Sequence, residues 1–289
     1  MRLAYHLVNV FTRDGARLSG NPLCVFEDAA ALDEATMQRL ARQFNLSETT
    51  FILPSARATA RVRIFTPAFE MPFAGHPTLG TAHIVRRLAA AAGRARDRVE
   101  LEMQAGIIPV EARGDLWTLT ANEPRHRETG VEPAALAAAF GIGAGDLLAQ
   151  GAGPRPLWVD TGSEQLIVPL VDAAAVERVA PRFAALAQLR SRQGRQLALV
   201  FAETGEGTVL ARFLFEDGGA VREDPATGSA CANLGGWYLA TGTRAPLVRR
   251  VHQGERVQRP STLLLSVDAE RRIRVGGEVA WVGKGELEL

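Results

Sequence analysis

Short runs of apolar residues, separated by polar or glycine-containing turns, dominate the first part of the chain. The spacing of Met37, Leu40, Ala41 and Phe44 predicts one helix, and Asp33 stands where its N-cap is expected. The other runs are short and end at turn residues, which is typical of strands. They predict strands over residues 3–11, 23–26, 49–53, 60–66, 99–103, 107–112 and 116–120.

The second part of the chain repeats this plan after a polar stretch at 122–130, which contains Pro124 and predicts a linker. Residues 171–176 (VDAAAV) resemble 27–32 (EDAAAL), and 211–215 (ARFLF) resemble 60–65 (ARVRIF). In each part a strand is followed by a glycine-rich turn and a helix of small residues. The repeat predicts an α+β protein with two similar halves, 1–120 and 121–275. Residues 276–289 are expected to return to the first half as a last strand.

Composition and charge exclude several classes of protein. The chain has 289 residues, 47% of them hydrophobic and 22% charged, with a net charge of +1. No basic field favours nucleic acid or an anionic membrane surface as a partner. No apolar run approaches the roughly 18 residues that cross a bilayer, and the first residues do not resemble a signal peptide. We therefore expect a cytoplasmic protein.

Cysteine and lysine content restricts the chemistry further. The two cysteines, Cys24 and Cys231, cannot build a disulfide framework and have no metal-binding spacing around them. The single lysine, Lys284, lies between two glycines in the expected last strand. That position is poor for the Schiff base that pyridoxal phosphate requires. We expect neither a metal nor an organic cofactor.

Two glycine-rich turns are candidate anion sites, at 73–82 and at 223–230. Small residues at the start of a helix allow several backbone N–H groups to converge on a negative charge. Gly75 and Thr78 belong to the first turn, and Gly228 and Ser229 belong to the second. Taken alone, either turn is more often a simple helix cap. Together, they favour a site for a small carboxylate in the cleft between the two halves.

Three side chains near these turns could transfer or hold a proton. Glu48 lies between the predicted helix and a strand, and in an enclosed site its pKa can rise enough for acid/base work. His76 and Asp224 each precede a proline at a predicted helix start. The alternatives remain open at this point: a solvated loop charge for Glu48, a local backbone bond for His76 and an N-cap for Asp224. His83 follows His76 by about two turns, but no third ligand indicates a metal site.

Several of these segments together resemble the PhzF (phenazine-biosynthesis) family. They are residues 20–22 (GNP), 45–51 (NLSETTF), 63–67 (RIFTP), 72–77 (PFAGHP) and 224–230 (DPATGSA). The resemblance implies a diaminopimelate-epimerase-like fold, in which each half is a curved, mostly antiparallel sheet around a central helix. It maps the family's catalytic glutamate onto Glu48 and the remaining site residues onto His76, Asp224 and Ser229. Related epimerases use two cysteines, and neither Cys24 nor Cys231 falls in the corresponding turns.

The resemblance implies a cofactor-independent isomerase that moves a proton within a small carboxylate-bearing metabolite. Glu48 would be the acid/base, and a homodimer is compatible with the sequence. An amino-acid racemase or epimerase is the alternative enzyme, with acid/base groups on both faces of one carbon. A non-catalytic protein that binds small carboxylates is the alternative outside enzymes. Nothing beyond the motifs identifies the substrate.

Overall fold

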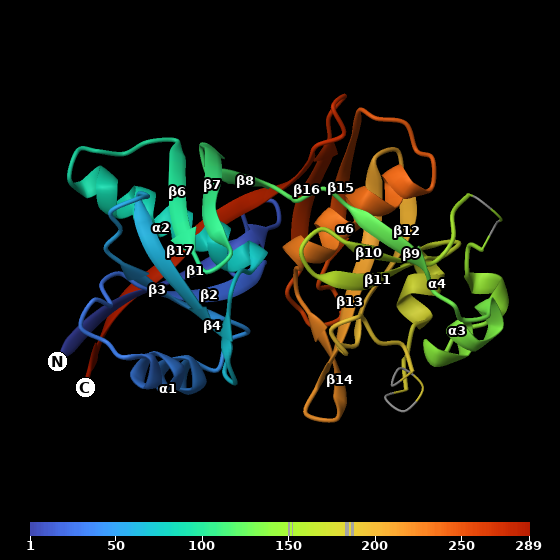
Figure 1. Cartoon of the computed structure of the whole chain (residues 1–289), viewed down its shortest axis with the longest axis horizontal. Coiled ribbons are helices and arrows are strands. Elements are labelled where there is room, and N and C mark those ends of the chain that lie inside the picture. The colour runs from blue at the N-terminus through green and yellow to red at the C-terminus, as the bar shows by residue number, and fades with distance from the viewer. Residues whose placement is uncertain (150, 152, 183–184, 186–187) are drawn as a thin grey trace. The chain divides into compact units, whose positions relative to one another are not determined.

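The computed structural model describes residues 1–149, 151, 153–182, 185 and 188–289 (Figure 1). Its contacts divide the chain into two compact units. Unit 1 is Met1–Thr120 with Gly276–Leu289, and unit 2 is Ala121–Val275. The fold is a mixed sheet with few helices, as the sequence predicts.

Unit 1 is built from strands around one long helix. Its strands are β1 (Arg2–Thr12), β2 (Asn21–Phe26), β3 (Thr49–Leu53), β4 (Ala60–Phe65), β5 (Glu70–Met71), β6 (Arg98–Met103), β7 (Gly106–Arg113), β8 (Leu116–Thr120) and the end of β17 (Ile273–Glu288). β1–β2, β3–β4 and β6–β7 pair antiparallel, whereas β2–β3 and β4–β6 pair parallel. β7 pairs with β8, β8 pairs with β17 and β17 pairs with β1, so the pairing returns to its start.

The two helices of unit 1 follow directly from their sequence. α1 (Glu34–Phe44) begins where Asp33 accepts a hydrogen bond from the Thr36 N–H, and it buries Met37, Leu40 and Ala41, as predicted. α2 (Gly75–Ala91) packs against β1–β4 and β6–β8, and the small residues of its buried face let it approach these strands closely. A Cβ on Gly80 would lie 2.6 Å from the Leu23 side chain. Close packing against β2 therefore fixes the N-terminal part of α2, which carries His76.

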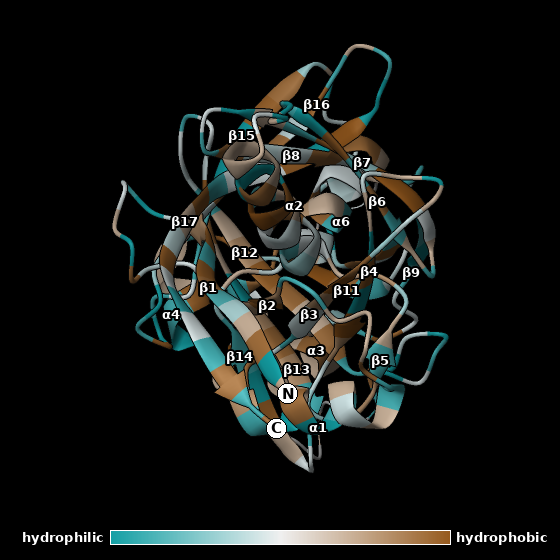
Figure 2. Cartoon of the chain, turned by 90° about the vertical axis from the view of Figure 1, so that its left-hand side faces the viewer, coloured by the Kyte–Doolittle hydropathy of each residue, from teal (hydrophilic) through white to brown (hydrophobic). Residues whose placement is uncertain are grey.

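The last strand of the chain pairs with the first. β17 pairs antiparallel with β1, with Arg2 opposite Glu288, so the chain ends lie side by side (Figure 1). Glu27 receives Lys284 Nζ at 3.0 Å and lies 2.8 Å from His6 Nε2. In Figure 2, the strands that lead to the N and C labels show bands of hydrophobic and hydrophilic colour.

Unit 2 contains a second set of strands together with several helical segments. Its strands are β9 (Arg125–Glu128), β10 (Leu157–Asp160), β11 (Glu164–Pro169), β12 (Leu197–Gly205), β13 (Thr208–Asp217), β14 (Ala220–Asp224), β15 (Leu247–Gln253) and β16 (Ser261–Val267). β10–β11, β12–β13 and β15–β16 pair antiparallel, whereas β11–β12 and β13–β15 pair parallel. The described helical segments are α3 (Pro133–Ala139), η1 (Ala144–Asp146), α4 (Ala173–Arg178) and α6 (Gly228–Ala240).

The prediction of a linker at 122–130 is wrong, because the strand β9 lies within this segment. β9 pairs antiparallel with β10, so backbone groups hold this segment in the sheet of unit 2. Its side chains are mostly exposed, which explains the polar composition that suggested a linker. Arg127 is the exception: its guanidinium donates to Glu164 at 2.8 and 2.9 Å and lies 4.7 Å from the centre of the Trp158 ring.

No helix in the described part of the chain is long and apolar enough to cross a membrane. Both cysteines are buried, and burial raises the pKa of each thiol above its usual range. Gly141, at the end of α3, adopts a φ of 68°, the left-handed conformation in which glycine commonly ends a helix.

Candidate active site

Glu48 and His76 come together in unit 1. The Glu48 Oε2 atom lies 3.6 Å from His76 Nε2, and their side chains are only 16% and 6% exposed. Asn45, in a left-handed conformation at the C-cap of α1, turns the chain toward β3 and brings Glu48 to the start of that strand. A buried hydrogen bond of 2.8 Å between the Thr50 and Thr81 hydroxyls ties β3 to α2. The glutamate and the histidine are therefore held by elements that are fixed to each other.

The hydrogen bonding of His76 determines which ring nitrogen carries its proton. His76 bonds to the backbone of Pro22, and because proline has no N–H, the imidazole must donate to the Pro22 carbonyl. Nε2 makes no hydrogen bond to any residue that the structure describes, so the donor is Nδ1–H. Nε2 then carries a lone pair on the side of Glu48. Burial lowers the pKa of His76 to about 3, with the Pro22 bond opposing, so the ring is neutral.

This arrangement places an acceptor nitrogen beside a carboxyl oxygen. The separation of 3.6 Å is too long for a hydrogen bond. A proton on the carboxyl group, or a donor group on a ligand, would link the two atoms. The histidine can thus stabilise the glutamate in its protonated form without itself becoming charged.

The first turn of α2 contains Gly75 and Thr78. Ala74 occupies the N-cap position and has no side-chain oxygen, so it cannot cap the helix N–H groups. The buried Thr78 hydroxyl donates to the Ala74 carbonyl at 2.6 Å. Thr78 therefore shapes the first turn, and its hydroxyl hydrogen is already used within that turn.

The turn around Asp224 lies in unit 2, between β14 and α6. Thr227 is the N-cap of α6, yet its hydroxyl donates to Asp224 Oδ2 instead of accepting from the helix N–H groups. The buried Gln253 amide donates to the Asp224 carbonyl at 2.8 Å and to Thr227 Oγ1 at 3.1 Å. A Cβ on Gly254, whose φ is +87°, would lie 2.6 Å from the Pro225 carbonyl. The chain around Asp224 is thus fixed by Gln253 and Gly254, which sequence reasoning missed.

Ser229 follows Gly228 in the first turn of α6, and two buried amides hold it. Gln165 Nε2 donates to Ser229 Oγ at 2.9 Å, and Asn233 Nδ2 donates to Gln165 Oε1 at 2.9 Å. Asn233 is fully buried and Gln165 is 2% exposed. The one available sequence signal is that Asn233 stands four residues after Ser229, on the same helix face.

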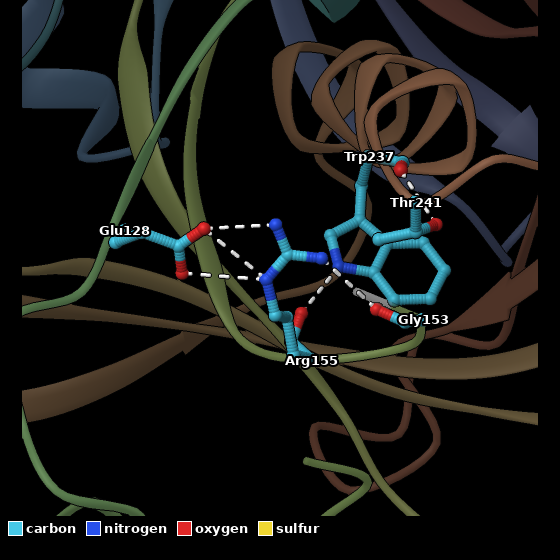
Figure 3. A network of polar contacts seen from close by, with 5 residues as sticks. All are labelled: Glu128, Gly153, Arg155, Trp237 and Thr241. Carbon is cyan, nitrogen blue, oxygen red and sulfur yellow. Dashed lines mark hydrogen bonds and ion pairs between the residues drawn. The ribbon is translucent and has the colours of Figure 1, made fainter. Parts of the chain in front are cut away.

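The other end of α6 is anchored by the network in Figure 3. The indole of Trp237 donates to the Arg155 carbonyl at 2.8 Å, and the Arg155 guanidinium donates to Glu128 on β9 at 2.8 Å. The Thr241 hydroxyl donates to the Trp237 carbonyl at 2.9 Å. The Ser229–Gln165 bond near one end of α6 and the Trp237–Arg155 bond near the other tie the helix to the rest of unit 2.

The structure therefore groups the predicted site residues in two places. Glu48, His76, Gly75 and Thr78 lie in unit 1, and Asp224, Gly228 and Ser229 lie in unit 2. Within the described ranges, no group of three or more His, Cys, Asp or Glu residues is arranged to hold a metal ion. His83 does not join a metal cluster but accepts a hydrogen bond from the Trp117 indole at 3.3 Å.

Two isomerases are similar to the chain over nearly its whole length. The chain is 38% identical over 297 residues to an uncharacterized isomerase of Pasteurella multocida, covering 98% of this chain and 93% of that protein. It is 33% identical over 297 residues to the trans-2,3-dihydro-3-hydroxyanthranilate isomerase of Pseudomonas aeruginosa, covering 99% of each.

Solved structures show the same fold. A PhzF-family phenazine biosynthesis protein of Bacillus anthracis superposes with a TM-score of 0.84 at 23% identity, over the whole of both chains. A hydroxyproline epimerase of Agrobacterium vitis superposes with a TM-score of 0.63 at 13% identity, covering 100% of this chain and 93% of that one. The fold is therefore shared with both PhzF proteins and epimerases.

The fold and the relatives define the class of protein as an isomerase. The family model described as phenazine biosynthesis-like protein (PhzC-PhzF) matches residues 8–285. The chain belongs to this family, as the motifs in its sequence indicate, and its relatives imply a small-molecule substrate.

Proposed function

We propose that the protein moves a proton within a small cyclic or amino carboxylate, with Glu48 as the single acid/base and no cofactor. The observation that carries this proposal is the enclosed Glu48–His76 pair, whose facing atoms lie 3.6 Å apart. The relative from Pseudomonas aeruginosa is named for trans-2,3-dihydro-3-hydroxyanthranilate, which makes that compound the first substrate to test.

The proposed reaction has two proton transfers and leaves the composition of the substrate unchanged. Glu48, as a carboxylate, takes a proton from an activated carbon, and the electron pair of the C–H bond enters the conjugated system. The protonated Glu48 then returns the proton to another carbon of that system. One positioned acid/base group of this kind is typically worth roughly 10²–10⁴-fold in rate.

His76 supports the intermediate stage, in which Glu48 carries the proton. Its neutral ring presents the Nε2 lone pair toward Glu48 Oε2, so the carboxylic O–H has an acceptor when the two atoms move closer. A protonated imidazole would instead favour the ionised carboxylate and oppose proton uptake. Burial of His76 keeps the ring in the form that the mechanism needs.

We further propose that Asp224 and Ser229 hold the polar groups of the substrate. Neither Ala74 nor Thr227 caps its helix with a side chain, which leaves first-turn N–H groups of α2 and α6 as donors for a carboxylate. The units would be two similar halves, since strand pairing in each alternates antiparallel, parallel, antiparallel, parallel, antiparallel.

The test is to incubate the protein in D₂O with a panel of cyclic and amino carboxylates and to locate deuterium by NMR. An isomerase of this type converts the substrate to a product whose proton has moved to a different carbon. Deuterium at a single stereocentre, with loss of optical purity, would establish the racemase alternative instead. Saturable binding of a panel member with neither conversion nor exchange would establish the binding-protein alternative.

A further inference from the structure

A chain of hydrogen bonds in unit 2 runs through the buried side chains of Asn233 and Gln165, ends on Ser229 and has only one possible direction. It begins at Thr161, whose backbone N–H and hydroxyl lie 2.8 and 2.7 Å from Asn233 Oδ1. A backbone N–H can only donate, so the Asn233 atom that faces it must be the oxygen. The other end of the Asn233 amide lies 2.8 Å from the Ser163 carbonyl, which can only accept.

The direction is passed on through Gln165. Because the nitrogen of Asn233 faces Gln165 at 2.9 Å, the Gln165 atom there must be its oxygen. The nitrogen of Gln165 must then face Ser229, which it does at 2.9 Å. An amide nitrogen donates and does not accept. The Ser229 oxygen is therefore an acceptor toward Gln165, and its hydrogen must point to some other acceptor.

We propose that Asn233 and Gln165 are positioning residues that make Ser229 an obligatory hydrogen-bond donor to the substrate carboxylate. This inference rests on the proposed function, which places a carboxylate at the start of α6. A serine hydroxyl without this constraint rotates freely and can present either its hydrogen or its lone pairs. With this constraint, Ser229 favours a ligand group that accepts a hydrogen bond over one that donates.

Replacing Gln165 by glutamate tests the direction of the chain. In Gln165→Glu, a carboxylate still accepts from Asn233 and also accepts from Ser229, so the serine hydrogen turns inward. In Gln165→Met, a side chain of similar size makes no hydrogen bond, and the serine hydrogen remains available to the ligand. The two variants remove the same amide and differ in what they do to Ser229.

The experiment is a double-mutant cycle that measures binding by calorimetry. The probe is 3-hydroxyanthranilate, the aromatic analogue of the compound for which the Pseudomonas aeruginosa relative is named. In the wild-type background, Ser229→Ala should weaken binding roughly 10-fold, as expected for a hydrogen bond to a charged group. In the Gln165→Glu background the same substitution should change affinity by less than about 2-fold, because the hydrogen has already been lost to the ligand. In the Gln165→Met background its full effect should remain.

Circular dichroism of every variant confirms that unit 2 is folded before binding is compared. An equal effect of Ser229→Ala in all three backgrounds would overturn the inference. Any loss of affinity in Gln165→Glu would then come from its added charge and not from a changed direction of the Ser229 hydrogen. Equal loss of the serine effect in Gln165→Glu and Gln165→Met would also overturn it, because it would indicate a merely structural role. If the wild-type protein binds neither the probe nor any other carboxylate of the panel, the carboxylate proposal itself fails, and this inference fails with it.

Discussion

Acidification should destabilise the protein through His76. The pKa of this buried ring is lowered to about 3, whereas an unfolded histidine titrates near 6.5. Below about pH 6.5 the unfolded chain therefore binds more protons at this residue than the folded one, and the free energy of unfolding falls as pH falls. The loss is about 1.4 kcal/mol per pH unit and amounts to about 2 kcal/mol between about pH 8 and about pH 5.

The variant His76→Gln isolates this contribution, because glutamine does not titrate. Urea unfolding of both proteins at about pH 8 and about pH 5 gives the two free energies of unfolding. Wild type should lose about 2 kcal/mol more than the variant over this interval. The same pair is measured in a Glu48→Gln background, which removes the neighbouring carboxyl group. Equal losses in wild type and variant would refute the neutral, buried histidine on which the proposed mechanism depends.

Two further substitutions test the packing of unit 2. Arg127→Met leaves a buried carboxylate without its bidentate partner and should cost about 1–3 kcal/mol in urea unfolding, whereas Arg125→Met on the same strand is exposed and should cost less than about 0.5 kcal/mol. Gly254→Ala forces a Cβ against the Pro225 carbonyl at a φ of +87° and should destabilise by at least about 1 kcal/mol, whereas Gly145→Ala, with nothing within 4 Å, should be nearly neutral. If Arg127→Met or Gly254→Ala left the free energy of unfolding unchanged, the contacts assigned to that residue would be wrong.

Most elements of the fold could be predicted from the sequence, because helix caps, helical spacing and turn residues lie within or beside the element that they specify. The helical spacing that contains Met37 and Leu40, with Asp33 at its start, specifies α1 within a few residues. β9 was missed for a physical reason: it is held by backbone bonds to β10, while its side chains are mostly exposed. The polarity of this segment therefore resembles that of a linker. Only its pairing with β10, about 30 residues away in sequence, distinguishes a strand from a linker here.

The candidate site was predictable as residue types but not as geometry. Glu48 and His76 are 28 residues apart, and their proximity depends on the tie between β3 and α2, which no periodicity indicates. Gln165, Asn233 and Gln253 were not anticipated, because a buried amide looks like any other polar residue in a sequence. Their importance is visible only in the structure, where their hydrogen bonds hold Ser229 and the backbone of Asp224 in place.

The most direct test of the proposed mechanism is the rate of proton transfer in Glu48→Gln. The substitution keeps the shape of the side chain but removes its ability to accept a proton. With trans-2,3-dihydro-3-hydroxyanthranilate, or whichever carboxylate the wild-type protein converts, turnover in D₂O should fall at least roughly 10²-fold, while affinity measured by calorimetry should change little. Glu111→Gln, at an exposed glutamate on β7, is the matched control and should keep the wild-type rate. Wild-type turnover in Glu48→Gln would contradict the account, because a different group would then have to carry the proton.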